Sequence, residues 1–212
     1  MSTSPSYPPA PWHLAGDLVG TVLRMPPGAL PPDLLPEHLP VTRKDGGVDL
    51  VAGWVDYRPG GLLAYREFLV AALLPGRLPL TGSILRIWVD SEASLAGGRE
   101  LWDIPKRLAE FDFAGNHARI LLAGKELAAF TYRERFRLPV RLPCPVDVVQ
   151  ETPGRHRRTR SSWRAELSVG RGRLTAAEDG ELDFLNRGRV LAHLGLRDFR
   201  VTFGVRSEVT GA

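Results

Sequence analysis

Residues 83–113 read SILRIWVDSEASLAGGRELWDIPKRLAEFDF, and they hold the most informative pattern of the chain. Its first eight residues are dense in branched apolar and aromatic side chains, which is typical of a strand. From Glu92 to Leu108, helix-forming residues are mixed with Gly97, Gly98 and Pro105. Because glycine and proline weaken a helix interior, we expect short helical turns here rather than one long helix.

The chain from Val48 onward has the texture of a β protein. Runs rich in Val, Ile, Leu and aromatic residues recur at roughly the 8–12-residue spacing of a sandwich or barrel. Besides residues 83–90, the predicted strands are VDLVAGWVDY (48–57), YREFLVAALL (65–74), ARILLA (118–123), ELAAFTYRERF (126–136), VRLPCPVDVV (140–149), SWRAELSV (162–169) and DFRVTFGVRSEV (198–209). A helix is expected at Leu182–His193. We therefore expect one mainly β domain over residues 1–212.

The first forty residues differ from the rest because they hold ten of the eighteen prolines. Proline lacks a backbone donor, so this segment is expected to contain neither a long regular helix nor a central strand. We interpret residues 1–15 as an extended N-terminal arm and Leu18–Arg24 as a strand. Ala29–Leu39, ALPPDLLPEHL, resembles a short helix that begins at Pro-Pro-Asp and is stopped by proline.

Composition excludes several classes of protein. With 43% hydrophobic and 25% charged residues in 212, the chain is typical of an ordinary globular domain. No apolar run approaches the roughly 20 residues of a membrane span. The N-terminus also lacks the charged and apolar regions of a signal peptide, so we predict a cytoplasmic protein with no membrane partner.

No metal site is expected from the sequence. The single Cys144 excludes an intrachain disulfide and a cysteine metal cluster. The histidines are scattered without the spacing of metal ligands; they are His13, His38, His117, His156 and His193.

The basic residues draw attention to the lysines. Of the 28 basic residues 25 are arginine, and the three lysines are Lys44, Lys106 and Lys125. Arginine supplies a permanent charge, whereas only lysine supplies an amine that can lose its proton and attack a carbonyl. Each lysine retained in such a chain is therefore a candidate nucleophile.

The surroundings of Lys106 favour an uncharged amine. Arg107 places a permanent cation beside it, and the neighbouring Ile104 is apolar. Further hydrocarbon is available from Leu101, Trp102, Leu108 and Phe111. A like charge and burial both lower a lysine pKa from its ordinary value of about 10.4. A free amine at neutral pH is the requirement for Schiff-base formation with a ketone.

The run GGRELWDIPKRL at 97–108 resembles the GRE…(F/Y)PKKL signature of the acetoacetate decarboxylase family. Upstream, WVDSEASLAGGRE, YREFLVAALL and GTVLRMPPGALPPDLLPEHL are similar to that family's segments in the same order. The resemblance covers about residues 16–111. It implies a single-domain antiparallel β-barrel or cone with short peripheral helices. It further implies a homo-oligomeric Schiff-base lyase that decarboxylates a β-keto acid without a metal or organic cofactor.

The resemblance also assigns roles to particular residues. Lys106 corresponds to the Schiff-base nucleophile, and Arg107 stands where the family has a second lysine that perturbs its pKa. Glu67 matches a glutamate that faces the active-site cavity, from which it would move protons during imine formation. Arg24 matches an arginine at the cavity mouth that recognises a substrate carboxylate. We further expect substrate contacts from two hydrophobic residues, Trp88 and Ile104.

Some positions depart from the family pattern and keep other functions open. A second cavity glutamate has no counterpart, because its position falls near Ala52, and Ile104 replaces an aromatic residue. The C-terminus is also shorter. The same lysine would serve an aldolase, dehydratase or cyclase acting on an oxo acid or a specialised metabolite. A non-catalytic barrel that binds an apolar ligand would instead hold Lys106 in a salt bridge.

One basic segment raises a different possibility. Residues 155–173 hold seven arginines against one acid, Glu166, and such a patch can bind nucleic acid. The segment contains a single aromatic residue, Trp163, and no recognised binding motif. We therefore favour a solvated loop or an oligomer contact, with a small-molecule oxo acid as substrate and no nucleic-acid partner.

Overall fold

The computed structural model describes residues 6–76 and 79–211. Strands make up 63% of the described residues, which confirms the mainly β prediction. They are β1 (Trp12–Met25), β2 (Val48–Tyr57), β3 (Tyr65–Leu73), β4 (Leu80–Val89), β5 (Lys106–Leu108), β6 (Glu110–Ala114), β7 (His117–Leu122), β8 (Lys125–Pro143), β9 (Val146–Thr152), β10 (Arg155–Ala176) and β11 (Arg189–Gly211). The helices of the described part are α1 (Glu92–Trp102) and the short 3-10 helix η1 (Asp183–Arg187).

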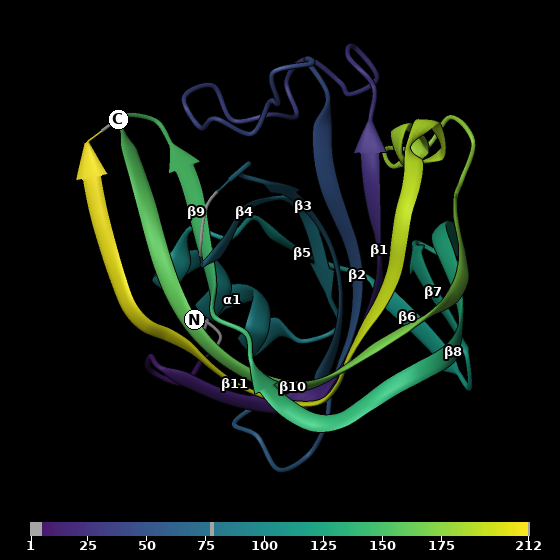
Figure 1. The fold of residues 1–212 in the computed structure, drawn as a ribbon. Helices are drawn as coiled ribbons and strands as arrows, with labels where there is room; N and C mark the ends of the chain where they lie inside the picture. Colours follow the sequence, from purple (N-terminus) through teal and green to yellow (C-terminus); the bar gives the residue numbers. More distant parts are fainter. Residues whose placement is uncertain (1–5, 77–78, 212) are drawn as a thin grey trace.

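Seven strands close into a barrel. Their order is β11-β1-β2-β3-β4-β9-β10, and β10 pairs back onto β11. Neighbouring strands are antiparallel except at β4, which pairs in parallel with β9 and with the short β5. The second half of β10 leaves the barrel and pairs with β8, which continues the sheet through β7 to β6. Figure 1 shows β10 and β11 curving along the molecule, with α1 inside the ring of strands. The predicted barrel is thus confirmed.

Two hydrophobic clusters lie on opposite faces of the barrel wall. Side chains alternate between the faces of a strand, so β3 contributes Phe68 and Val70 to one cluster and Tyr65 and Leu69 to the other. We call the first the sheet-side cluster, because it packs β6–β8 against the barrel. The second, which includes Trp102 of α1, is the helix-side cluster.

The segment from Glu92 to Trp102 is one continuous α-helix, so the expected series of short turns is wrong. Ser91 caps its N-terminus, since its hydroxyl accepts a hydrogen bond from the backbone N–H of Ser94 at 3.2 Å. At the other end Asp103 adopts a left-handed conformation with φ 56° and closes the last turn. The capping interactions and the packing of α1 in the helix-side cluster outweigh the low helix propensity of its two glycines.

Two other helix predictions also fail. In Leu182–His193 only η1 is helical, because from Arg189 onward the chain pairs with β1 as strand β11. Ala29–Leu39 forms turns and bends instead of a helix. Its prolines remove the backbone donors that a helix needs, and the segment is anchored by the burial of Leu34 in the sheet-side cluster.

The N-terminal arm is shorter than predicted. Strand β1 already begins at Trp12, which pairs with Phe203 of β11, so residues 12–15 belong to the barrel and not to an arm. The predicted strand at Leu18–Arg24 lies inside β1. Residues 1–5 of the predicted arm lie outside the described residues.

The arginine-rich segment 155–173 is part of strand β10 and not the expected solvated loop. The arginines at its start are paired with acids: Arg155 and Arg157 both contact Asp103, and Arg158 contacts Asp147 at 2.6 Å. Within the described residues, no helix is long and apolar enough to cross a membrane.

The fold predicts that two phenylalanines contribute very differently to the free energy of unfolding. Phe68 is fully buried and packs between Trp54 and Trp88, whereas Phe136 is 61% exposed. Phe68→Ala should leave a cavity and lower the free energy of unfolding by about 3–5 kcal/mol. Phe136→Ala, the control, should change it by less than about 0.5 kcal/mol. Urea denaturation of both variants measures the difference, and equal effects would contradict this packing.

Candidate active site

Lys106 is held at the start of β5 by contacts of its own backbone. Its N–H donates to the carbonyl of Ile104 at 2.8 Å, and its carbonyl accepts from Arg99 Nε of α1 at 2.8 Å. Parallel pairing with β4 sets Lys106 opposite Ile87, a residue of the helix-side cluster. Arg99 is therefore a structural residue that positions the lysine.

The Gly-Gly pair of α1 makes room for two side chains. A Cβ at Gly97 would collide with the ring of Trp12. A Cβ at Gly98 would lie 2.7 Å from Cδ of Lys106 and 2.8 Å from its Cε, much closer than atoms in contact allow. The two glycines let α1 lie directly against the lysine side chain, which explains why they stand in a helix interior.

The amine of Lys106 ends among polar groups in the barrel. Its Nζ lies 2.8 Å from Glu67 Oε2 and 2.8 Å from Ser94 Oγ, and it donates a longer hydrogen bond of 3.4 Å to the Tyr65 hydroxyl. The Tyr57 hydroxyl donates to the other oxygen of Glu67 at 3.3 Å. Lys106 and Glu67 are 4% and 3% exposed, so this is a buried ion pair. The site joins β2, β3, α1 and β5.

The electrostatics of the pair differ from the sequence-based expectation. Burial lowers the pKa of Lys106, but the Glu67 carboxylate and its hydrogen bond outweigh burial, and the pKa is raised above the ordinary lysine value. The predicted low pKa is therefore wrong for this arrangement. Burial and the charge of Glu67 raise the pKa of Tyr65 to about 12. The same two causes raise the pKa of Tyr57, so both tyrosines stay protonated and neutral.

Arg107 does not act on the amine. Consecutive residues of β5 point to opposite faces, and the Arg107 guanidinium forms an ion pair with Glu181 at 2.6 Å and lies over the Trp88 ring. The prediction that Arg107 perturbs the lysine fails for this geometric reason.

Arg24 is not brought to the site either. Its guanidinium is paired with Asp49 and Asp45. Asp49 lies on β2 eight residues from Tyr57, which corresponds to roughly 26 Å along an extended strand. A substrate carboxylate held at Lys106 therefore cannot reach Arg24.

The predicted substrate contacts divide between the two faces. Ile104 is buried in the helix-side cluster next to Lys106. Trp88 shares the opposite face with Arg107 and stacks on Phe68 in the sheet-side cluster, so its predicted role beside the lysine is wrong. Ala52 also lies in the sheet-side cluster, away from the amine. Residue 52 is therefore not part of the site around Lys106, and its position does not correspond to a second acid there.

Three polar residues of the site were missed by the sequence analysis. Tyr65 shares a strand face with Glu67, which the alternation of β3 predicts. Tyr57 joins them because it lies opposite Tyr65 in the pairing of β2 with β3. The hairpin between these two strands sets that register. Ser94 is fully buried in the first turn of α1, and its sequence context gives no signal for contact with Lys106.

The same fold occurs in several solved structures. An acetoacetate decarboxylase from Legionella pneumophila subsp. pneumophila str. Philadelphia 1 superposes with a TM-score of 0.72 at 16% identity, covering 97% of this chain and 89% of that chain. A second acetoacetate decarboxylase structure gives 0.71 at 18% identity, covering 98% and 92%. The enduracididine biosynthesis enzyme MppR, complexed with pyruvate, gives 0.68 at 18% identity, covering 97% and 92%. The sequence matches no functionally curated protein.

The fold and the site together define a β-barrel protein with a lysine–carboxylate pair enclosed by its strands and one helix. The sequence profile of the acetoacetate decarboxylase family matches residues 1–141, two thirds of the chain. The chain belongs to the acetoacetate decarboxylase family. The matched residues include Glu67, Ser94 and Lys106, so the family match and the buried pair coincide.

The close packing of α1 on the lysine predicts an unusual effect of alanine. In an exposed helix interior Gly→Ala stabilises by about 1 kcal/mol, but Gly98→Ala should instead destabilise by about 1–3 kcal/mol because the new methyl overlaps the Lys106 stem. Gly53→Ala is the control, since its Cβ would meet Leu69 at an ordinary 3.7 Å. Thermal and urea unfolding report both changes, and stabilisation by Gly98→Ala would contradict the contact.

Removing the carboxylate should reverse the pKa shift of Lys106. In Glu67→Gln the burial of the amine is no longer opposed by a charge, so its pKa should fall below the ordinary value of about 10.4. Breaking the buried pair should also cost about 3–5 kcal/mol of stability at neutral pH. The pH dependence of Lys106 labelling by a small amine reagent, read by peptide mass spectrometry, measures the pKa.

Glu181→Gln is the matched control for that experiment, because it removes the acidic partner of the neighbouring but outward-facing Arg107. Its labelling profile should follow the wild type. A profile that moves equally in both variants would show that Glu67 has no special influence on the amine.

Proposed function

We propose that the protein is a Schiff-base-forming lyase that decarboxylates a β-keto acid through Lys106. The observation that carries the proposal is the amine of Lys106, buried and 2.8 Å from the Glu67 carboxylate, at the position that the family resemblance assigns to the nucleophile. A carboxylate at this distance is a base within reach of the proton that the amine must lose.

The buried pair supplies both the nucleophile and the first proton transfer. Transfer of one proton from the Lys106 ammonium to Glu67 leaves a neutral amine and a neutral acid, which removes two opposite charges from the barrel interior. The amine adds to the substrate ketone. Loss of water, with Glu67 returning the proton to the departing oxygen, gives a protonated imine. The overall exchange of ammonium and ketone for iminium and water conserves charge and protons.

The iminium then acts as the electron sink for the carbon–carbon bond. The bond to the β-carboxylate breaks, its electron pair forms an enamine, and CO₂ leaves. Apolar walls such as Ile104 and Ile87 favour the neutral CO₂ over a solvated carboxylate. The enamine carbon takes one proton, and water hydrolyses the new imine to release the ketone and regenerate the Lys106 ammonium. One proton is consumed in each turnover.

Ser94 and Tyr65 are suited to support the imine chemistry. Both hydroxyls lie within hydrogen-bond distance of Nζ, and Tyr65 remains protonated because its pKa is raised to about 12. A neutral hydroxyl can donate to the carbinolamine oxygen that forms beside Nζ. We assign both to positioning that intermediate, with Glu67 as the group that moves protons.

A carbon–carbon bond-forming reaction is the second candidate. The same enamine can attack an aldehyde instead of taking a proton. Structures of MppR contain pyruvate and the condensation product of pyruvate and imidazole 4-carboxaldehyde. Because this chain shares that fold, a pyruvate-like oxo acid is a reasonable alternative substrate. Dehydration or cyclisation of such an adduct belongs to the same candidate.

A third reading assigns the barrel no catalysis at all. A binding protein would hold Lys106 in a permanent salt bridge, and the ion pair with Glu67 is what that reading expects. Only the reactivity of the Lys106 amine separates an enzyme from a binding protein. The predicted cytoplasmic location, self-association and lack of a nucleic-acid partner remain predictions.

Borohydride trapping tests the proposed lysine directly. The protein is incubated with acetoacetate or with pyruvate, reduced and digested, and adducts are located by mass. An adduct is expected on Lys106 and should be absent from Lys106→Arg, because a guanidinium does not form the imine. Lys125→Arg is the control, since Lys125 is exposed at the start of β8. Release of CO₂ from acetoacetate then separates decarboxylation from condensation.

The outcomes divide the candidates. An adduct with CO₂ release supports the lyase, whereas an adduct without CO₂ but with an aldehyde-dependent product supports condensation. If Lys106 forms no adduct with either acid, and CO₂ release from acetoacetate is no faster with the wild type than with Lys106→Arg, the enzyme proposal fails and the binding barrel is favoured.

A further inference from the structure

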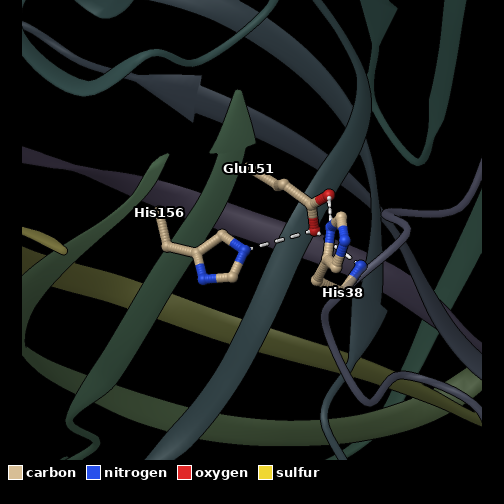
Figure 2. Close-up of side chains that lie close together, drawn as sticks. All are labelled: His38, Glu151 and His156. Atoms are coloured by element: carbon tan, nitrogen blue, oxygen red, sulfur yellow. Dashed lines mark hydrogen bonds and ion pairs between the residues drawn. The ribbon is translucent and has the colours of Figure 1, made fainter. Parts of the chain in front are cut away.

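Three side chains from distant parts of the sequence meet on the barrel, in a group that the proposed lysine chemistry does not use. His38 comes from the loop between β1 and β2, Glu151 from the end of β9, and His156 from the start of β10. Each offers one donor atom, and these atoms lie within 4.8 Å of one another. Figure 2 shows the Glu151 carboxylate between the two imidazole rings.

Two of the three side chains are fixed by the sheet. Glu151 and His156 are directly opposite each other in the β9–β10 ladder. A two-residue turn of Pro153 and Gly154 joins the strands, and Gly154 adopts a φ of 75°, which glycine accepts without strain. Cross-strand partners have Cβ atoms about 5 Å apart, so this register sets the carboxylate and the imidazole beside each other.

The third side chain is held by the carboxylate. Glu151 Oε2 accepts from the backbone N–H of His38 at 3.0 Å, and Glu151 Oε1 lies 2.9 Å from Nδ1 of the His38 ring. The His38 side chain is 55% exposed, so its ring can rotate at small cost. The loop is thereby tied to the hairpin through one partly buried carboxylate.

One buried nitrogen in this group has no hydrogen bond. Among the described residues, Nε2 of His156 is buried without a hydrogen-bond partner, although it lies 3.5 Å from Glu151 Oε2. A buried polar atom left unpaired costs free energy.

We propose that His38, Glu151 and His156 bind a divalent transition-metal ion of the zinc class. Two imidazole nitrogens and one carboxylate oxygen form a donor set that Zn²⁺ takes, with water in the fourth position. Tetrahedral bonds of about 2.0–2.1 Å require donors about 3.3 Å apart, a modest contraction that rotation of the exposed His38 ring supplies. The bound ion satisfies the unpaired nitrogen of His156.

The ion acts as a clip between the β1–β2 loop and the β9–β10 hairpin. The loop also buries Leu34 and Val41 in the sheet-side cluster, so fixing it supports one wall of that cluster. In the described part of the chain, the hydrogen bonds of the Lys106 amine go to Tyr65, Glu67 and Ser94 and to no residue of the clip. The sequence offered no such site because its ligands are 113 and 5 residues apart, and only the fold brings them together.

Titration of metal-stripped protein tests the clip. The chain is treated with a chelator, dialysed and titrated with ZnCl₂ by calorimetry, in parallel with CoCl₂ followed by visible absorption. One equivalent of Zn²⁺ should bind, and Co²⁺ should give the intense visible bands of a tetrahedral site. His38→Ala, which changes an exposed side chain and is expected to fold, should weaken binding at least tenfold. Glu151→Gln and His156→Ala should weaken it further.

His13→Ala is the control, because His13 contacts Thr202 on the β1–β11 pair instead. It should bind Zn²⁺ as the wild type does. Zinc should also raise the melting temperature of the wild type and of His13→Ala but not that of His38→Ala. The proposal is overturned if no stoichiometric binding is found, or if the three ligand variants bind as tightly as the control; the group is then only a hydrogen-bonded cluster.

Discussion

The buried ion pair between Lys106 and Glu67 is the constraint around which this barrel is arranged. Two charges enclosed by protein must be matched closely, because desolvation of either alone is costly. The match needs β3 to turn Glu67 inward, β5 to start at Lys106, and α1 to lie against the lysine stem. Glycine at position 98, the bond from Arg99 to the lysine carbonyl and the hydroxyl of Ser94 all serve that one contact.

The sequence predicted the parts of this arrangement that depend on local pattern. Strand texture located β2 and β3 almost to the residue, and the spacing of Gly-Arg-Glu and Pro-Lys singled out Lys106. The inward direction of Glu67 came from its match to a family glutamate that faces the cavity, because strand alternation alone only places it on the same face as Tyr65. Fold class was equally accessible, since short apolar runs separated by turns leave few alternatives to a barrel or a sandwich.

The remaining features depend on which face a residue occupies and on contacts between distant segments. Arg107 is next to Lys106 in the chain but on the other side of β5, so sequence adjacency gave a wrong electrostatic partner and a wrong direction for the pKa. Helix α1 was predicted as broken turns because its glycines were judged by propensity. Their real role is steric and is visible only when the lysine stem is in place. The segment after Arg187 was predicted as helix from its sequence, but it pairs with β1 as a strand.

The depth of Lys106 has a consequence for chemical fidelity. Exposed lysines in a cell meet reducing sugars, cyanate and reactive acyl compounds, and each of these modifies free amines without any catalyst. An amine that is 4% exposed and covered by a helix meets such reagents far less often than an exposed lysine does. It is further held as an ammonium, which is not nucleophilic, until a proton moves to Glu67. The barrel thereby slows the uncatalysed modification of Lys106.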